Sequence, residues 1–118
     1  LRMKLEVFMQ DFKFFYRAMK FLKSVSLSKY PIKVRRKDIK ENASGFCIKK
    51  DGYFLILIDK NLSEEHSIDI LLHEIAHADS WAEGYNHGLD WAIAFRRLYN
   101  LWEAFLDDWN EKIINGEK

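Results

Sequence analysis

The sequence contains little cysteine, proline or glycine: one Cys, one Pro and five Gly among 118 residues. A single thiol, Cys47, excludes an internal disulfide and a zinc ribbon built on cysteine ligands. The scarcity of glycine and proline excludes collagen and a low-complexity linker. No uncharged apolar stretch of about 18 residues occurs, which argues against a membrane-spanning helix within this sequence. The sequence is therefore not that of a disulfide scaffold, a linker or a membrane span.

Apolar and aromatic residues are plentiful, at 48% and 15% of the sequence. This aromatic content excludes a disordered chain, and a chain of this length buries roughly two-thirds of the surface that its unfolded form exposes. We therefore expect one domain over 1–118, without internal repeats. The first 23 residues contain no unbroken apolar run of the kind found in secretory signals. Together with the single thiol, this indicates an intracellular, cytoplasmic protein.

The net charge of +1 conceals a strong asymmetry. Residues 1–50 contain 14 Lys or Arg and 4 Asp or Glu, whereas residues 51–118 contain 5 and 14. The simplest interpretation is that the two halves pack together and expose faces of opposite charge. The alternative is a basic surface that contacts nucleic acid. Because no zinc ribbon or aromatic-basic motif accompanies this charge, we expect such contact to be weak and salt-sensitive.

Two segments in the first three-quarters of the chain have the periodicity of helices. Apolar residues spaced by three or four positions predict an amphipathic helix over about 4–23. Asn61 or Ser63 can cap a second helix, whose first turn is acidic. The pattern predicts that this second helix runs to about Glu83 and stops at Gly84.

A third helix is predicted over about 90–114. Apolar residues repeat along it at alternating spacings of four and three: Trp91, Phe95, Leu98, Trp102, Phe105 and Trp109. We interpret the three tryptophans of this stripe as anchors of the hydrophobic core.

Three segments between the first two helices have strand character. Ile32–Arg36 is short and alternating, and Asp51-Gly52 lies between two apolar runs, 45–50 and 53–59. An Asp-Gly pair in that position predicts a hairpin with a type I′ turn, in which both central residues have positive φ. The run 53–59 is apolar enough for an inner strand covered on both faces, whereas 45–50 alternates and suits an edge. The sequence thus predicts an α+β fold, with a small, mostly antiparallel sheet of about three strands packed with three helices.

The second predicted helix contains the pattern H-E-x-x-H at residues 73–77. His73 and His77 are four residues apart on a helix, so both imidazoles lie on one face and can bind one metal ion. Glu74 is turned about 100° from His73, which places it beside the metal and not on it. There the carboxylate can take a proton from a metal-bound water molecule. This is the arrangement of zinc peptidases.

A catalytic zinc ion needs a third protein ligand and one open position. The candidates are His87, Glu83 and Asp90. A helix rises about 9 Å between His77 and Glu83, and three extended residues from Gly84 span about 10 Å. His87 would therefore come back level with His77, whereas Glu83 would lie too far along the helix.

Other polar residues are weaker candidates for a role in the site. Asp69 lies four residues before His73 and can orient that imidazole, although a solvated acid in the first turns is the simpler interpretation. We interpret Cys47 as a small buried hydrophobe. Four residues can stabilise an oxyanion and none stands out: Tyr53, Tyr85, Arg96 and Arg97.

The segment HEIAHA at 73–78, followed by Trp81 and by HGLDW at 87–91, resembles the SprT-like zinc metallopeptidases. That family includes Spartan-type proteases and small phage-encoded relatives. Its pattern is H-E-x-x-H, a small residue, a loop, and H-G-x-x-F/W opening a helix; the match covers about 53–99. The resemblance implies a minimal zincin fold, Zn²⁺ bound by His73, His77 and His87, and Glu74 as catalytic acid/base. Larger members carry a C-terminal Cys₄ zinc ribbon or DNA-binding segments, and this sequence has neither.

The sequence therefore predicts a zinc-dependent endopeptidase acting on a peptide or protein substrate, which would lie extended along 45–50 by strand addition. No membrane partner is expected. The alternative is a non-catalytic, zinc-stabilised binding or assembly domain, associated with nucleic acid through its basic N-terminal half. In that alternative a fourth ligand such as Asp90 closes the site. The number of protein ligands on the zinc ion distinguishes the two hypotheses. Three protein ligands plus water indicate a catalytic site, and four protein ligands indicate a structural one.

Overall fold

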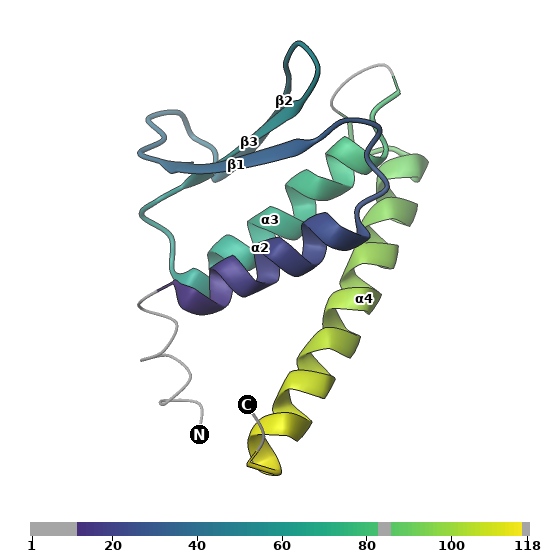
Figure 1. Ribbon diagram of the computed structural model, residues 1–118. Coiled ribbons are helices and arrows are strands. Elements are labelled where there is room, and N and C mark those ends of the chain that lie inside the picture. Colours follow the sequence, from purple (N-terminus) through teal and green to yellow (C-terminus); the bar gives the residue numbers. More distant parts are fainter. Residues whose placement is uncertain (1–11, 83–85, 117–118) are drawn as a thin grey trace.

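The computed structural model describes residues 12–82 and 86–116, which form three helices and a three-stranded sheet (Figure 1). Along the chain the elements are α2 (Lys13–Val25), β1 (Ile32–Lys37), β2 (Gly45–Lys49), β3 (Phe54–Asp59), α3 (Glu64–Asp79) and α4 (Leu89–Ile114). The predicted α+β class, with three helices and three strands, is confirmed over these residues. None of the described helices combines the length and the apolar character needed to cross a bilayer.

The sheet has the strand order β1-β3-β2, so β3 is the inner strand and β2 lies at an edge, as predicted. β2 pairs with β3 antiparallel, and β1 pairs with the other side of β3 in parallel. The sheet is therefore mixed. The hairpin between β2 and β3 is confirmed, but its type I′ turn is wrong: Gly52 has φ 85°, whereas Asp51 is not among the described residues with positive φ. Lys50 N–H donates to the Tyr53 carbonyl at 2.8 Å and closes the turn.

Within residues 12–82 and 86–116, helices cover one face of β3 and leave the other uncovered (Figure 1). Phe54, Ile56 and Ile58 are buried, whereas Leu55 and Leu57, which alternate with them, are partly exposed. Figure 1 shows why, because all three labelled helices lie on the same side of the sheet. The expectation that this strand is covered on both faces is therefore wrong. A strand with one covered face normally alternates apolar and polar residues, but β3 is apolar on both faces, so its sequence does not show which face is covered.

Of the first predicted helix, over 4–23, the structure describes the part from Phe12 onward, where α2 begins at Lys13 after the left-handed φ of 59° at Phe12. Residues 4–11 lie outside the described residues. No side chain caps α2 locally, and the carboxylate of Glu64 accepts a hydrogen bond from Phe15 N–H at 2.7 Å instead. Glu64 is in the first turn of α3 and is buried. This contact fixes the start of α2 on the start of α3 and satisfies a helix-end donor.

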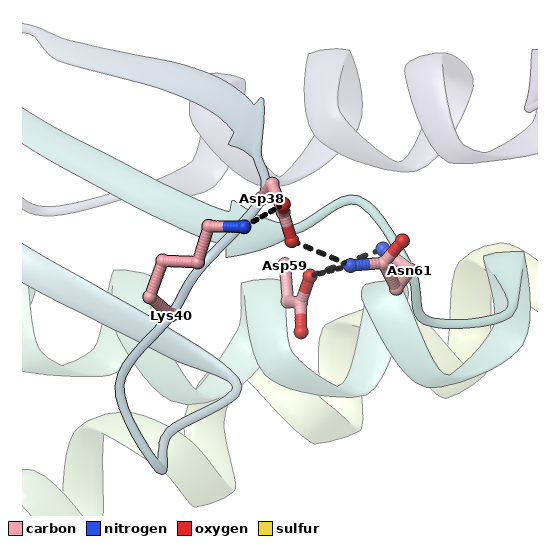
Figure 2. Close-up of polar contacts among 4 residues, drawn as sticks. All are labelled: Asp38, Lys40, Asp59 and Asn61. Carbon is pink, nitrogen blue, oxygen red and sulfur yellow. Dashed lines mark hydrogen bonds and ion pairs between the residues drawn. The ribbon is translucent and has the colours of Figure 1, made fainter.

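Ser63 is the residue that caps α3, and its hydroxyl accepts a hydrogen bond from the backbone of the third residue of the helix at 3.1 Å. Asn61, the other predicted cap, has a different role (Figure 2). Its amide donates to Asp38 Oδ1 at 2.9 Å and to Asp59 Oδ1 at 3.0 Å. Lys40 donates to the second oxygen of Asp38 at 2.8 Å. These bonds tie the connection that leads into β2 to the turn between β3 and α3.

α3 ends at Asp79, four residues earlier than the predicted end at Glu83. The hydroxyl of Ser80 and its backbone N–H both donate to the Ala76 carbonyl, at 2.8 and 3.1 Å. A serine side chain that bonds the carbonyl four residues back competes with continuation of the helix. Ser80 thus stops the helix, not Gly84, which lies outside the described residues.

The hydrophobic core lies between the sheet and the helices. α4 contributes Leu98 and Trp102, which are both buried, and its observed bounds agree with the prediction to within one residue. Cys47 faces the core from β2 and is 4% exposed, as expected of a small buried hydrophobe. Burial raises the pKa of this thiol to about 12, with Glu74 and Asp79 contributing through their charges. Cys47 is therefore a neutral thiol at neutral pH and not a nucleophile.

Candidate metal centre

Three histidines from two parts of the chain converge at one point. α3 carries His73, which is half-buried, and His77, which is 1% exposed, while His87 is exposed and directly precedes the N-cap of α4. His87 Nε2 lies 2.9 Å from His73 Nε2 and 3.1 Å from His77 Nε2. One ring nitrogen from each residue lies within 4.8 Å of the other two. The predicted ligand set is thus brought together, although α3 ends earlier than expected.

The spacing of these nitrogens fits a metal ion. Around a tetrahedral zinc ion with Zn–N bonds of about 2.0–2.1 Å, two nitrogen ligands are about 3.3 Å apart. A ring nitrogen carries either one proton or one lone pair, so His87 Nε2 cannot form good hydrogen bonds to two imidazoles that both offer lone pairs. One cation can accept all three lone pairs. The three histidines can therefore hold a metal ion.

The electrostatics of the cluster favour the neutral imidazoles that bind metals. Burial, together with the neighbouring His73 and His87, lowers the pKa of His77 to about 4. The pKa of His73 is lowered by burial and by His87. At neutral pH His73 and His77 are therefore uncharged, with a lone pair available for a metal ion.

Glu74 is not part of the histidine cluster, as its position in the helix predicts. Its side chain is 3% exposed and is not one of the three metal-facing residues. Its carboxylate lies under the start of β2, since a Cβ atom on Gly45 would be 3.5 Å from Glu74 Oε2. The same Cβ would be 2.6 Å from Ile70 Cγ2 and 2.8 Å from the Leu57 carbonyl oxygen. Only glycine allows this approach, which brings the edge strand next to the carboxylate.

Gly45 was not recognised as a site residue from the sequence. The available signal was its position as the first residue of an alternating strand, where a glycine often marks a close approach of two backbones. The partner in that approach, α3, is brought there by the tertiary fold, so the sequence could not identify it.

Trp91 is the second residue whose role the sequence did not reveal. It packs against the core, as predicted, but its ring also contacts the histidines, with centroid distances of 4.9 Å to His73, 5.7 Å to His77 and 4.8 Å to His87. Its Nε1–H donates to the backbone carbonyl of His73 at 3.2 Å. The sequence feature that indicates this contact is the spacing of four residues between His87 and Trp91, which places Trp91 near that histidine.

Among the described residues, no other candidate joins the cluster. Asp90 is exposed and offers no ligand atom to it, and Glu83 lies outside the described residues. Asp69 is exposed, and no hydrogen bond joins it to His73 within 12–82 and 86–116; burial raises its pKa. Arg97 approaches Asp79 at 3.9 Å. Among the residues considered for an oxyanion, Tyr85 lies outside the described part of the chain.

A scan against protein-family models, a search of curated proteins and a search of solved structures each gave no match to this chain. The SprT-like resemblance therefore rests on the motifs at 73–78 and 87–91 alone, and the function must be argued from the geometry of this site.

Proposed function

We propose that this chain is a zinc-dependent endopeptidase with zinc held by His73, His77 and His87. The observation that carries the proposal is the convergence of three imidazole nitrogens within 4.8 Å. Two of these imidazoles are on α3, which also holds a buried carboxylate, Glu74, directly after His73. Three histidine ligands leave one position of a tetrahedral ion for water or substrate. Replacement of Glu74 by Gln in a peptidase assay tests the proposal.

Each residue has a defined task in this reaction. Bound zinc would polarise the scissile carbonyl and lower the pKa of a water molecule. Glu74 would take a proton from that water and later give it to the leaving amine, as general base and then general acid. The burial of Glu74 supports this assignment, because packing beside the edge strand limits the positions that its carboxylate can take.

Two features favour this proposal over a non-catalytic zinc domain. The alternative requires a fourth protein ligand, and Asp90, the candidate for that role, is exposed and offers no atom to the cluster. His87 is also exposed, so the ligand set is open to solvent on its side. A crystal structure with zinc bound would separate the two: three protein ligands plus water supports the peptidase, and four protein ligands supports the alternative.

We further propose that substrates lie antiparallel to the edge strand β2. Ser44 accepts a hydrogen bond from Asp59, and Lys50 donates one to Tyr53, so even-numbered residues of this segment pair with β3. In an antiparallel ladder the alternate residues point their N–H and C=O groups the other way. The backbone groups of Gly45, Cys47 and Lys49 are thus directed at the free edge, and the first of these lies beside Glu74.

Lys49→Pro is expected to weaken the binding of extended peptides that reach along β2 from Glu74. Proline removes one outward N–H without breaking a bond to β3, which edge strands tolerate. Losing one hydrogen bond of about 0.5–1.5 kcal/mol predicts a kcat/KM lower by roughly 2- to 10-fold. Lys49→Ala keeps the N–H and is the matched control. A bound peptide inhibitor that lies elsewhere, with the edge of β2 free, would contradict this binding mode.

The proposed contact with nucleic acid is expected to be weak. Three cations of the basic half, Lys33, Arg35 and Lys37, are exposed on β1. They alternate with residues that pack against the core, so they lie on the other face of the strand. Such a stripe attracts phosphates, but the attraction falls steeply with added salt. Titration of single-stranded and duplex DNA at low and moderate salt measures this. Sub-micromolar affinity near physiological salt would contradict this expectation and support the alternative of a domain associated with nucleic acid.

A further inference from the structure

His87 is the only one of the three histidines that is not on a helix. The backbone of α3 fixes His73 and His77 relative to each other, whereas His87 lies outside any helix, one residue before the N-cap Gly88. Its side chain is exposed. The position of His87 relative to the other two therefore depends on how the start of α4 is held against α3.

The indole of Trp91 lies where it can hold the start of α4. Trp91 is in the first turn of α4, and its Nε1–H donates to the backbone carbonyl of His73 on α3 at 3.2 Å. Its ring lies 4.8 Å from the ring of His87 at an interplanar angle of 90°, an edge-to-face contact. The Trp91 side chain thus donates a hydrogen bond to the helix that carries His73 and His77, and its ring packs against His87.

Trp91 is itself held in place by aromatic stacking along α4. Its ring stacks on Phe95 at 5.1 Å and 19°, and Phe95 stacks on Tyr99 at 6.1 Å and 23°. Residues spaced by four share one side of a helix, so the three rings form a continuous row. Rotation of the indole away from the histidines would break both the stacking and the hydrogen bond to His73.

We propose that Trp91 is the positioning residue of the metal centre, which holds His87 and the first turn of α4 so that the three Nε2 atoms converge before a metal ion binds. The inference rests on the metal site of the proposed function. Trp91 is not a ligand, because an indole N–H only donates. It acts through His87. Because Trp91 already restricts His87 in the metal-free protein, His87 loses less conformational freedom when a metal ion binds.

The test compares Trp91→Phe and Trp91→Leu with a matched control, Trp109→Phe. Trp109 is on the same helix, and its ring packs near Phe14 at 6.1 Å, away from the histidines. The zinc affinity of the apo proteins, measured by competition with a chromogenic chelator, is expected to fall 10- to 100-fold for both Trp91 variants. The control should change it by less than about threefold. If both Trp91 variants bind zinc within threefold of the parent, the proposal is overturned.

A spectroscopic readout does not depend on the Trp91→Leu variant folding. Co²⁺ quenches the fluorescence of nearby tryptophans, and Trp91 contacts all three histidine rings. One equivalent of Co²⁺ should therefore quench the parent, Trp109→Phe should keep this quenching, and Trp91→Phe should lose most of it. Unchanged quenching in Trp91→Phe would overturn the proposal.

Neither measurement uses peptidase activity, so the two proposals can fail separately. A protein that binds zinc as expected but cleaves no peptide would overturn the endopeptidase and leave the role of Trp91 standing. A parent protein that binds no zinc or Co²⁺ would overturn the metal centre, and the role of Trp91 with it.

Discussion

Glu74→Gln is expected to lower peptidase activity by about 10²- to 10⁴-fold, the range that general acid–base catalysis typically supplies. Glutamine keeps the size and shape of the side chain but cannot accept the proton. Because Glu74 is not one of the three residues whose nitrogens converge, zinc content should stay near the parent value. Activity is measured with a casein-type or peptide-library substrate, and zinc content and thermal unfolding are measured on the same preparations.

Glu65→Gln provides the control for this substitution. Glu65 is in the first turn of the same helix and is exposed, so the same chemical change there should leave activity and zinc content unaltered. Full activity in Glu74→Gln would overturn the proposed mechanism. Loss of zinc would instead make Glu74 a ligand and favour the non-catalytic alternative.

The parts of the site that follow from local geometry could be predicted from the sequence. His73 and His77 share a helix face because four residues are close to one helical turn, and no tertiary contact changes that. The 100° offset of Glu74 has the same origin. The hairpin could be predicted because an Asp-Gly pair favours a turn, and Ser63 could be proposed as a cap because its hydroxyl reaches a free backbone N–H.

The convergence of His87 was expected, but by a different route. The prediction took α3 to Glu83 and used Gly84 to turn the chain back. In the structure the hydroxyl of Ser80 ends the helix at Asp79, so the chain leaves α3 earlier and His87 still reaches the cluster. Helix ends are hard to predict because a serine inside a helix and a serine that stops one have the same sequence signal.

Features that depend on tertiary packing could not be predicted. The apolar run of β3 does not reveal that the described helices lie on only one side of the sheet. In the sequence, Gly45 looks like any other strand residue, and its close approach to α3 is visible only in the tertiary structure. Trp91 belongs to a stripe of core residues, and its approach to the histidines depends on how α4 crosses α3. In each case the deciding contact joins elements whose mutual placement no local pattern encodes.

His87→Ala is expected to lower zinc affinity by more than the roughly 100-fold that outer-shell partners of a metal site are worth, because it removes a ligand itself. The two remaining histidines, His73 and His77, would still offer a weak site on α3. One zinc ion per chain should bind the parent and little should remain on the variant after exchange into metal-free buffer. Elemental analysis and chelator competition measure both quantities.

The same substitution should abolish the stabilisation of the fold by zinc. A metal ion that binds only the folded state at 100 times its Kd stabilises it by about 2.7 kcal/mol, which for a chain of this size is a rise in Tm of roughly 10 °C. His66→Ala is the control, since His66 is exposed on α3 and is not part of the cluster. It should keep the full zinc-dependent rise. If His87→Ala keeps it too, then the third ligand is wrong, and the proximity of the three nitrogens would have another cause.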